Sequence, residues 1–443
     1  NLVGREILEG DEGVYLIPVQ ADTGYAQAAL TEPWACVVAS YDVTYRTGWK
    51  PGGSVLIVAG PAALESYEMG MPYAGDRPPA RVVAVGVAGK LLEELARRAQ
   101  QDGFELLRCA TLSKVPRILD NRQGFDDIVL LGADADLYER VEPLALKGCV
   151  FNLVGGQGFT RKAQVDVGRL HYDHISLTGT ESQDLSQAYV PIRTELLAGG
   201  NAAFLGAAGP MGQMHVQRAL QRPDGPRLIM ATDLVPERLA VIETKFARLI
   251  EARRGMTRVI LRTPDGRAPA EFNRGLVEAS GGHGYDDIVV LAPSAGVVAG
   301  AVEMLAEKGV MNIFAGLPTG TKAPIDLNVV TKKGIRFTGT SGSAIRDLRN
   351  MLAQAEAGEL DPNLSVAAIS GLRDAKKGLE GVVHQAFPGK VVIYPQVLDF
   401  PLTTLPELKE RLPNVYAKLG PNESWTNEAE AEFLAAMLRG GTA

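Results

Sequence analysis

The chain has 443 residues, enough for two or three domains with separate cores, and a formal charge of −7 at pH 7. Its lysines and arginines are scattered, which argues against a nucleic-acid partner. The three cysteines, Cys36, Cys109 and Cys149, are too far apart in sequence to indicate a disulfide framework, which suits a reducing cytoplasm. No apolar stretch is long enough to span a membrane and no signal peptide opens the chain, so we expect a cytoplasmic protein without a membrane partner.

A long internal repeat organises the sequence. The segment GFDDIVLLGA, which begins at Gly124, returns as GYDDIVVLAP at Gly284, and residues 174–180 (HISLTGT) return at 334–340 (GIRFTGT) with the same spacing of 160 residues. Several matches in constant order indicate tandem duplication of a whole domain. We place the first copy at residues 49–195 and the second copy at 196–357, between end segments at 1–48 and 358–443.

Each copy alternates short apolar runs with amphipathic stretches. In the second copy we expect strands at 201–207, 226–233, 257–263, 286–293 and 309–316, and helices at 211–221, 235–252 and 299–309. The strand segments lack two-residue polar alternation, which is typical of strands buried on both faces of a parallel sheet. The sequence therefore predicts an α/β protein with two tandem Rossmann-like, doubly wound parallel sheets.

A glycine turn follows the first strand of the second copy. Gly206, Gly209 and Gly212 precede or open the expected helix, and such a turn lets backbone N–H groups approach a pyrophosphate. Asp233 ends the next strand, where an acid accepts hydrogen bonds from an adenosine ribose. An acid there also repels a 2′-phosphate, so NAD is favoured over NADP. The alternative is that Asp233 merely caps the following helix.

Arg238 stands five residues beyond Asp233. Its guanidinium could stack on the adenine or retain some NADP binding.

The first copy has lost these features. Ile57 stands opposite Gly206 and Ala63 opposite Gly212, and the strand at 81–87 ends without an acid. We expect a Cβ at position 63 to crowd the contact between helix and strand. The first copy should therefore keep its sheet while its dinucleotide site is lost or altered.

The order of the motifs resembles a known family. TEPWACVVASY (31–41), GAAGPMG (206–212), TDLVPERL (232–239), GYDDIVVLAP (284–293) and GKVVIYP (389–395) follow one another as in medium-chain dehydrogenase/reductases. The order is most similar to the zinc-dependent polyol and sugar-phosphate branch, such as sorbitol dehydrogenases and sorbose-1-phosphate reductases. The resemblance implies that the end segments form a partial, β-rich GroES-like catalytic domain, completed at its C-terminal end by a helical tail.

What the resemblance implies for function is hydride transfer. The chain would be an NAD(P)-dependent oxidoreductase that interconverts a secondary alcohol, a polyol or sugar phosphate, and its ketone. Glu32 would lie near a catalytic metal as catalytic residue or ligand. The resemblance also assigns cofactor contacts to the turn and to three later strand ends, namely Gly209, Pro210, Met211, Gly212, Ala292, Ala315, Gly316 and Thr340.

The zinc expected from the resemblance has no ligand set in this sequence. The residues before Glu32 contain neither Cys nor His, whereas a catalytic zinc needs three protein ligands. Zinc is left open: the start has been removed, another chain supplies the ligands, or the chemistry is lost. The alternative function is a non-catalytic dinucleotide-binding sensor or scaffold subunit.

Assembly is open as well. The chain could form a homo-oligomer or bind a partner chain that completes the catalytic domain. Family members commonly dimerise at an edge strand of the nucleotide domain. The two fused copies could therefore pair their sheets inside one chain and hide an edge.

Other polar residues are interpreted as structural. His171 and His174 have a spacing that suggests a metal, but at a strand entrance they do not share a face. His215 is expected to pack on the sheet. The paired acids ending in Asp127 and Asp287 precede a buried strand in both copies, and we expect them to hold loop backbone.

Overall fold

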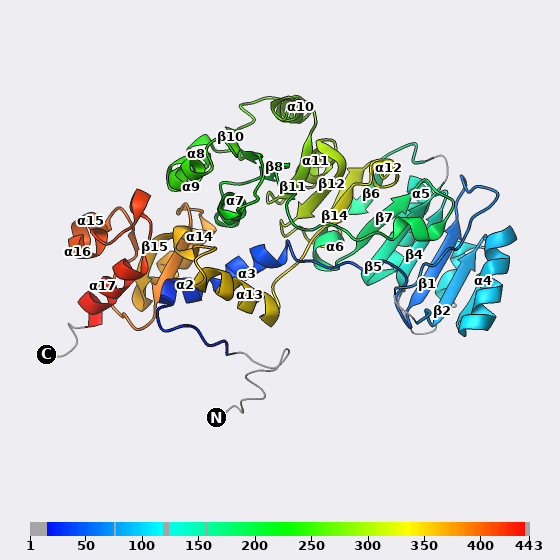
Figure 1. Ribbon diagram of the computed structural model, residues 1–443, viewed down its shortest axis with the longest axis horizontal. Coiled ribbons are helices and arrows are strands. Elements are labelled where there is room, and N and C mark those ends of the chain that lie inside the picture. Colours follow the sequence, from blue (N-terminus) through cyan, green and yellow to red (C-terminus); the bar gives the residue numbers. More distant parts are fainter. Residues whose placement is uncertain (1–15, 75–76, 118–123, 156–157, 439–443) are drawn as a thin grey trace. The chain divides into compact units, whose positions relative to one another are not determined.

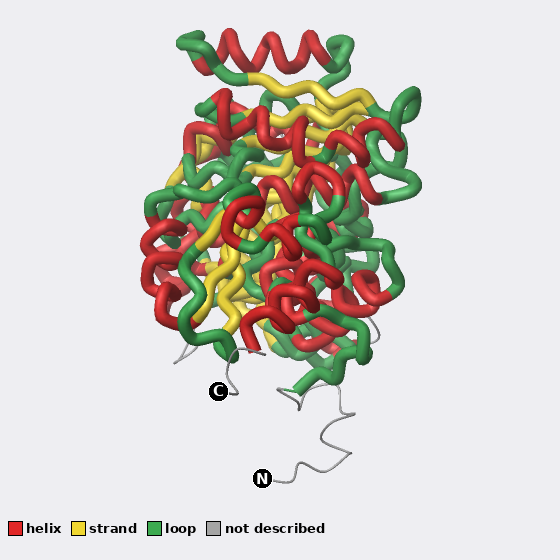
Figure 2. Tube along the Cα trace, turned by 90° about the vertical axis from the view of Figure 1, so that its left-hand side faces the viewer, coloured by secondary structure: helices red, strands yellow, loops and turns green. Residues whose placement is uncertain are grey.

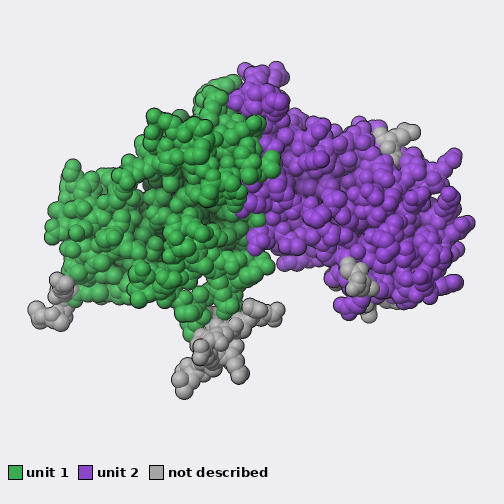
Figure 3. Space-filling view, in the orientation of Figure 1, with its two compact units in different colours: residues 1–41, 197–267, 342–443 green, residues 42–196, 268–341 purple. Residues whose placement is uncertain are grey.

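The computed structural model describes residues 16–74, 77–117, 124–155 and 158–438 (Figure 1). The chain divides into two compact units (Figure 3). Unit 1 comprises residues 1–41, 197–267 and 342–443, and unit 2 comprises residues 42–196 and 268–341. The bounds of the four segments expected from the sequence remain a prediction, and residues 1–15 of the first segment lie outside the described residues.

The first sequence copy builds a six-stranded parallel sheet in unit 2. Its order is β3-β2-β1-β4-β5-β7, with a central crossover between β1 and β4. The strands are β1 (Ser54–Ala59), β2 (Arg81–Val85), β3 (Glu105–Cys109), β4 (Phe125–Leu131), β5 (Ala145–Val154) and β7 (Ser176–Thr180). The helices of this copy are α4 (Gly89–Asp102), α5 (Ala135–Val141) and α6 (Val167–Tyr172). This strand order is that of a doubly wound Rossmann sheet.

The second copy repeats both halves of this topology. Unit 1 holds the parallel strands in the order β10-β9-β8, and unit 2 holds them in the order β11-β12-β14. They are β8 (Asn201–Leu205), β9 (Leu228–Thr232), β10 (Arg258–Arg262), β11 (Tyr285–Val290), β12 (Leu305–Ile313) and β14 (Arg336–Thr338). The strand halves β3-β2-β1 and β4-β5-β7 thus recur, which confirms two Rossmann-like α/β sheets.

Helices alternate with strands along the second copy, and Figure 2 distinguishes the helices of the chain from its strands by colour. They are α7 (Pro210–Gln221), α8 (Pro236–Lys245), α9 (Ala247–Ala252), α10 (Pro269–Ala279), α11 (Ala295–Val302) and α12 (Asn328–Lys332). The single long helix expected at 235–252 is divided into α8 and α9, which meet at the buried ring of Phe246. None of the helices in the described part of the chain is long and apolar enough to cross a membrane.

The two copies pair inside unit 2. Strand β6 (Ala163–Asp166) of the first copy and β13 (Lys322–Ile325) of the second form an antiparallel two-stranded sheet. Oδ2 of Asp166 accepts a hydrogen bond of 2.9 Å from the amide of Gly320, and Lys322 pairs with Glu142. The copies therefore pair through this small sheet, whereas among the described strands the main parallel sheets are not joined at an edge strand as expected.

The end segments form a mixed layer in unit 1. Strands β15 (Val366–Gly371), β16 (Lys390–Tyr394) and β17 (Thr403–Thr404) make a three-stranded sheet in the order β16-β15-β17. Helices accompany it: α2 (Tyr25–Ala29), α3 (Thr31–Ala39), α13 (Ile345–Glu356), α14 (Ala375–Val383), α15 (Leu408–Arg411), α16 (Pro413–Tyr416) and α17 (Asn427–Leu438). Described residues 16–48 form helices and loops without a strand. These segments thus contain less β structure than a β-rich domain implies.

A buried carboxylate joins the two end segments. Glu430 on α17 accepts hydrogen bonds from the amides of Tyr25 and Ala26, at 2.5 and 2.8 Å, and from the hydroxyl of Tyr394 at 2.7 Å. Three donors compensate the cost of burying this charge. The start of helix α2 is thereby fixed to the C-terminal sheet.

Candidate functional site

The glycine turn of the second copy joins β8 to α7. Gly206 has φ of +90°, in the region that favours glycine. The amides of Gly206 and Ala207 both donate to the carbonyl oxygen of Thr232, at 2.9 and 2.8 Å. The turn is therefore fixed to the carboxyl end of β9.

Gly212 and Gly209 of this turn differ in the space available for a side chain. A Cβ on Gly212 would lie 2.6 Å from the carbonyl oxygen of Ala207, so the close approach of α7 to the turn excludes any side chain there. A Cβ on Gly209 would meet no atom within 4 Å, and its φ of −70° suits any residue. Packing within the protein therefore explains Gly212 and leaves the surface at Gly209 open.

The N-terminus of α7 opens directly after this turn. Gly209 is its N-cap and makes no side-chain cap, Pro210 is its first residue, and Met211 follows half-buried. The first N–H groups of a helix have no partner within the helix, and the helix dipole adds partial positive charge. The twelve-residue helix α7 thus presents an uncapped, electropositive end of the kind that accepts phosphate.

Asp233, just after β9, holds the backbone of the turn by hydrogen bonds. Its Oδ2 accepts a hydrogen bond of 2.9 Å from the amide of Ala208, and its Oδ1 accepts one of 2.8 Å from Leu234. The following helix α8 has Val235 as its N-cap and no side-chain cap, so the alternative in which Asp233 caps that helix is wrong. Each carboxylate oxygen keeps a further lone pair.

Gln213 and Lys245 hold the turn through a chain of hydrogen bonds. The side-chain amide of buried Gln213 donates to the carbonyl oxygen of Ala208 at 2.9 Å and accepts from Nζ of Lys245 at 3.0 Å. Burial lowers the pKa of Lys245 to about 8. Lys245 also lines a pocket of about 400 Å³ with residues of the C-terminal segment such as Val366. The sequence analysis missed both residues, because only their meeting in space gives them this role.

Arg238 lies on α8 and is engaged within unit 1. Its Nη1 donates to Oε1 of Gln385 at 2.5 Å. Its contact with an adenine ring remains a prediction.

The residues expected beside the nicotinamide lie in unit 2. Ala292 follows β11, Ala315 and Gly316 follow β12, and Thr340 follows β14, so all four are at carboxyl ends of neighbouring parallel strands. That edge is where open α/β sheets bind ligands. The amide of Ala315 donates to the carbonyl oxygen of Val290 at 2.9 Å, which holds the end of β12 to the end of β11.

Glu32 lies in the first turn of α3 and is exposed. The thiol of Cys36 donates to its Oε1 at 3.4 Å, and burial, followed by the Glu32 charge, raises the pKa of Cys36 to about 11. Burial also lowers the pKa of Lys390, against the opposing effect of Glu32 and Cys36. Among the described residues no three His, Cys, Asp or Glu side chains gather to hold a metal, so this set does not fit a catalytic zinc.

The first copy has a closed crevice in place of a cradle. The amides of Gly60 and Ala62 donate to the carbonyl oxygens of Leu131 and Gly132, at 2.8 and 3.1 Å. Described residues 61–74 and 77–80 contain no helix, so β1 is not followed by a helix N-terminus. The cause differs from the crowding we expected at Ala63: the chain folds against the end of β4 instead.

His215, Asp127 and Asp287 each have a partner within the protein, and their structural role remains a prediction. His215 is fully buried, with Nδ1 2.7 Å from the hydroxyl of Tyr41, and burial lowers its pKa to about 3. Arg46 pairs with Asp127 at 2.9 Å in the first copy, and Arg193 pairs with Asp287 at 2.5 Å in the second.

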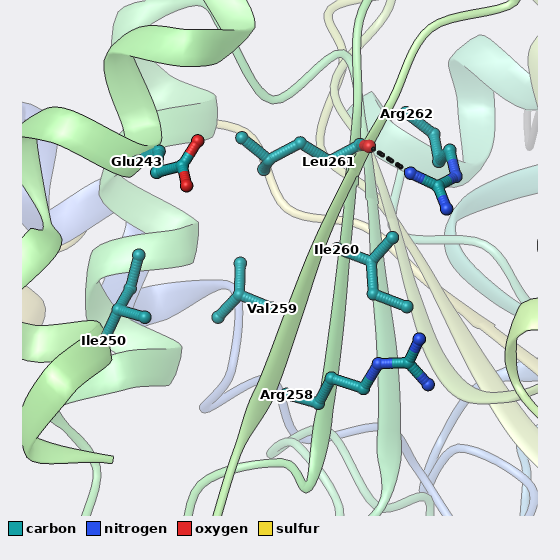
Figure 4. A pocket seen from close by; sticks show the side chains of 7 residues that line it. All are labelled: Glu243, Ile250, Arg258, Val259, Ile260, Leu261 and Arg262. Atoms are coloured by element: carbon teal, nitrogen blue, oxygen red, sulfur yellow. Dashed lines mark hydrogen bonds between the residues drawn. The ribbon is translucent and has the colours of Figure 1, made fainter. Parts of the chain in front are cut away.

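A second pocket lies beside the edge strand of unit 1 (Figure 4). Its volume is about 400 Å³, and it is lined by Glu243, Ile250 and residues 258–262 of β10. None of the residues expected to bind cofactor lines it. It therefore does not belong to the candidate site.

The fold and the turn define a Rossmann-like α/β protein with one intact glycine turn, and comparison with known proteins narrows this class. No family model matches the chain. The chain is 33% identical over 215 residues to the uncharacterized protein YggP of Escherichia coli K12, covering 48% of this chain and 49% of that protein. It is 30% identical over 210 residues to mannitol-1-phosphate 5-dehydrogenase of Aliivibrio fischeri (47% and 48%). It is also 32% identical over 246 residues to L-sorbose 1-phosphate reductase of Klebsiella pneumoniae (53% and 55%).

The chain thus spans about half the length of the curated relatives it matches. The expected resemblance to polyol and sugar-phosphate dehydrogenases is confirmed over that half. Similar solved structures include 2R,3R-butanediol dehydrogenase from Bacillus subtilis, with 22% identity over 45% of this chain and 51% of that one, at a TM-score of 0.36. An alcohol dehydrogenase from Thermotoga maritima has 18% identity, the same coverage and the same TM-score. At these TM-scores the solved structures carry no functional argument.

Proposed function

We propose that the chain is an NAD(P)-dependent alcohol or polyol dehydrogenase of the medium-chain type that acts in the cytoplasm. It would interconvert a secondary alcohol, in a polyol or sugar phosphate, and the corresponding ketone. The observation that carries the proposal is the pairing of the uncapped N-terminus of α7 with the Asp233 carboxylate across the turn at 206–212.

Different residues of the turn would bind different groups of the adenosine half of the cofactor. The amides at the start of α7 suit the pyrophosphate, since no atom of the described residues lies within 4 Å of a Cβ built on Gly209. The free lone pairs of Asp233 suit the two hydroxyls of a ribose, and its negative charge disfavours a 2′-phosphate. Gln213 and Lys245 keep the turn in place.

The nicotinamide, when bound, supplies the hydride acceptor or donor. The strand ends carrying Ala292, Ala315, Gly316 and Thr340 would border it. We propose phosphorylated polyols and ketoses as the first substrate class to test, because the named relatives are a mannitol-1-phosphate dehydrogenase and a sorbose-1-phosphate reductase. No step is assigned to zinc, since the residues around Glu32 do not make a three-ligand site.

The test is a titration with NADH and NADPH followed by fluorescence, then assays with polyol phosphates and unphosphorylated polyols, each with and without added zinc. We expect NADH to bind more tightly than NADPH and at least one substrate to be oxidised. Asp233→Asn is the matched variant, because it removes the charge while keeping an oxygen acceptor for one of the two backbone amides that Asp233 holds. Absence of binding by both nucleotides would refute the proposal.

A second candidate is a dinucleotide-binding sensor or scaffold subunit without turnover. Two observations favour it: the described residues contain no cluster of three metal-binding side chains, and the first copy has a closed crevice. Nucleotide binding without activity on any polyol, in the presence of zinc, would favour this candidate.

A further inference from the structure

The short helix α6 of the first copy lies against strand ends of the second copy. A Cβ on Gly168, in its first turn, would lie 2.3 Å from the carbonyl oxygen of Pro318. A Cβ on Gly339 would lie 2.8 Å from the carbonyl oxygen of Leu170. The backbones of α6 and of both strand ends are therefore in direct contact, with no room for a side chain between them.

His171 fixes the end of β12. Its Nδ1 lies 2.9 Å from the carbonyl oxygen of Ile313, the last residue of that strand, and its ring is buried. Because a carbonyl oxygen can only accept, Nδ1 carries the proton and donates. Ala315 and Gly316 follow Ile313 within three residues, so this hydrogen bond fixes the start of the segment expected beside the nicotinamide.

Tyr172 reaches the same segment. Its hydroxyl oxygen is 3.0 Å from the position that a Cβ on Gly316 would occupy, while its ring packs edge-on against His171 with centroids 4.5 Å apart. The side chain is partly exposed. The hydroxyl thus lies at the surface that Gly316 would present to a ligand.

Tyr45, just before the first copy, fixes the other strand end. Its hydroxyl accepts a hydrogen bond of 3.0 Å from the amide of Gly339, next to Thr340. The strand ends that carry Ala315, Gly316 and Thr340 therefore contact the first copy or the segment just before it.

The corresponding helix of the second copy, α12, lines only a small cavity at the strand ends of the first copy. By the repeat, α12 of the second copy corresponds to α6, and Thr331 and Lys332 correspond to His171 and Tyr172. They line a cavity of the first copy together with Gly155 and Thr180. Its volume is about 20 Å³, room for a single water.

We propose that the first copy acts as a built-in partner domain, in which His171 is a positioning residue and Tyr172 a bordering residue of the nicotinamide end of the cofactor site. This proposal rests on the proposed function. It gives the degenerate copy a role in cofactor binding although that copy has no cradle of its own. It also predicts that α6 affects only the nicotinamide half of the cofactor.

The test compares NADH with ADP-ribose, which has the adenosine and pyrophosphate half but no nicotinamide. Affinities of the full chain are measured for His171→Leu, His171→Asn, Tyr172→Phe and the control Lys332→Ala, with thermal unfolding to check folding. Asn can donate from the position of Nδ1, so it should rescue what Leu loses. Loss of one hydrogen bond predicts NADH affinity lower by about three- to tenfold in His171→Leu and Tyr172→Phe. ADP-ribose affinity should stay within about twofold, and Lys332→Ala should bind both nucleotides as the unmodified chain does.

Each other result overturns the proposal in a recognisable way. If His171→Leu weakens NADH and ADP-ribose equally, or if Asn fails to rescue, the residue is merely structural. If neither variant weakens NADH, α6 does not position the nicotinamide end. If the unmodified chain binds neither nucleotide, the proposed function itself fails, and this inference fails with it.

Discussion

The amide of Ala208 donates a hydrogen bond of 2.9 Å to Oδ2 of Asp233, which connects the turn before α7 to the end of β9. One carboxylate therefore has two roles: it holds the backbone of the turn, and it presents negative charge beside the N-terminus of α7. The two roles can be separated by substitution.

Asp233→Asn should lose the charge and retain an oxygen acceptor for only one of the two backbone amides, so the turn is weakened less than in Asp233→Ala. We expect NADH affinity to fall by about tenfold, the effect of one charge-assisted hydrogen bond, and discrimination against NADPH to weaken. Asp233→Ala should in addition lower the free energy of unfolding by about 1–2 kcal/mol, because the Ala208 and Leu234 amides lose their acceptor. Fluorescence titration and urea unfolding measure the two effects. Unchanged NADH affinity in both variants would contradict a ribose contact.

Gly209→Ala and Gly212→Ala form a matched pair. The Cβ added at Gly212 would lie 2.6 Å from the Ala207 carbonyl oxygen, so unfolding free energy should fall by about 1–3 kcal/mol, as for other overpacked sites. The Cβ added at Gly209 meets open space, so stability should change by less than about 1 kcal/mol. Only nucleotide affinity should fall there. Tight NADH binding by Gly209→Ala would show that the ligand does not approach this surface.

Lys245 should make stability depend on alkaline pH. Burial lowers its pKa from 10.5 to about 8 in the folded chain, so between these values the unfolded chain binds more protons. Stability therefore increases as pH rises through this window, by at most about 1.4 kcal/mol per pH unit for one group. Below pH 8 the Lys245 contribution is constant and at its least favourable.

Lys245→Met provides the comparison. Between pH 8 and 10.5 the free energy of unfolding of the original chain should rise relative to that of Lys245→Met. Other titrating groups are common to both proteins and cancel in the difference. Parallel stability curves over this range would contradict a lowered pKa of Lys245.

The antiparallel pairing of β6 with β13 predicts how assembly depends on the first copy. Removal of residues 50–195 exposes the edge of β13, and we expect the remainder to dimerise or aggregate in light-scattering measurements. The same deletion with Ile325→Lys is the control, because charge on an edge strand opposes pairing. A deletion product that stays monomeric without the lysine would argue against this role of the first copy.

Much of the fold could be predicted because its causes are local. The apolar runs at 201–205 and 286–290 indicate buried strands, and the 160-residue repeat assigns their counterparts. The acid pairs are also recognisable, since their recurrence in a copy without a glycine turn favours a structural role over a role in catalysis. The repeat likewise suggested that the copies pair, but through their main sheets rather than through β6 and β13.

What could not be predicted depends on contacts between distant residues. Gln213 and Lys245 meet across 32 positions, and Arg238 meets Gln385 across 147. The closure of the first copy depends on Ala62 reaching the carbonyl of Gly132, a choice of backbone path that side-chain identity at 63 does not reveal. In the sequence, the spacing of His171 and His174 suggested only a metal site that their positions argue against. The hydrogen bond from His171 to the carbonyl oxygen of Ile313 depends on the contact between the two copies.

The closed crevice at Gly60 and Gly132 sets the stoichiometry of the molecule. An ordinary dimer of two equal nucleotide domains has two equivalent binding events that can influence each other. Because the loop after β1 folds against the end of β4, we expect the first copy to bind no nucleotide, so saturation should occur at a single equivalent per chain, along a simple hyperbola. Any cooperativity would then have to arise between separate chains.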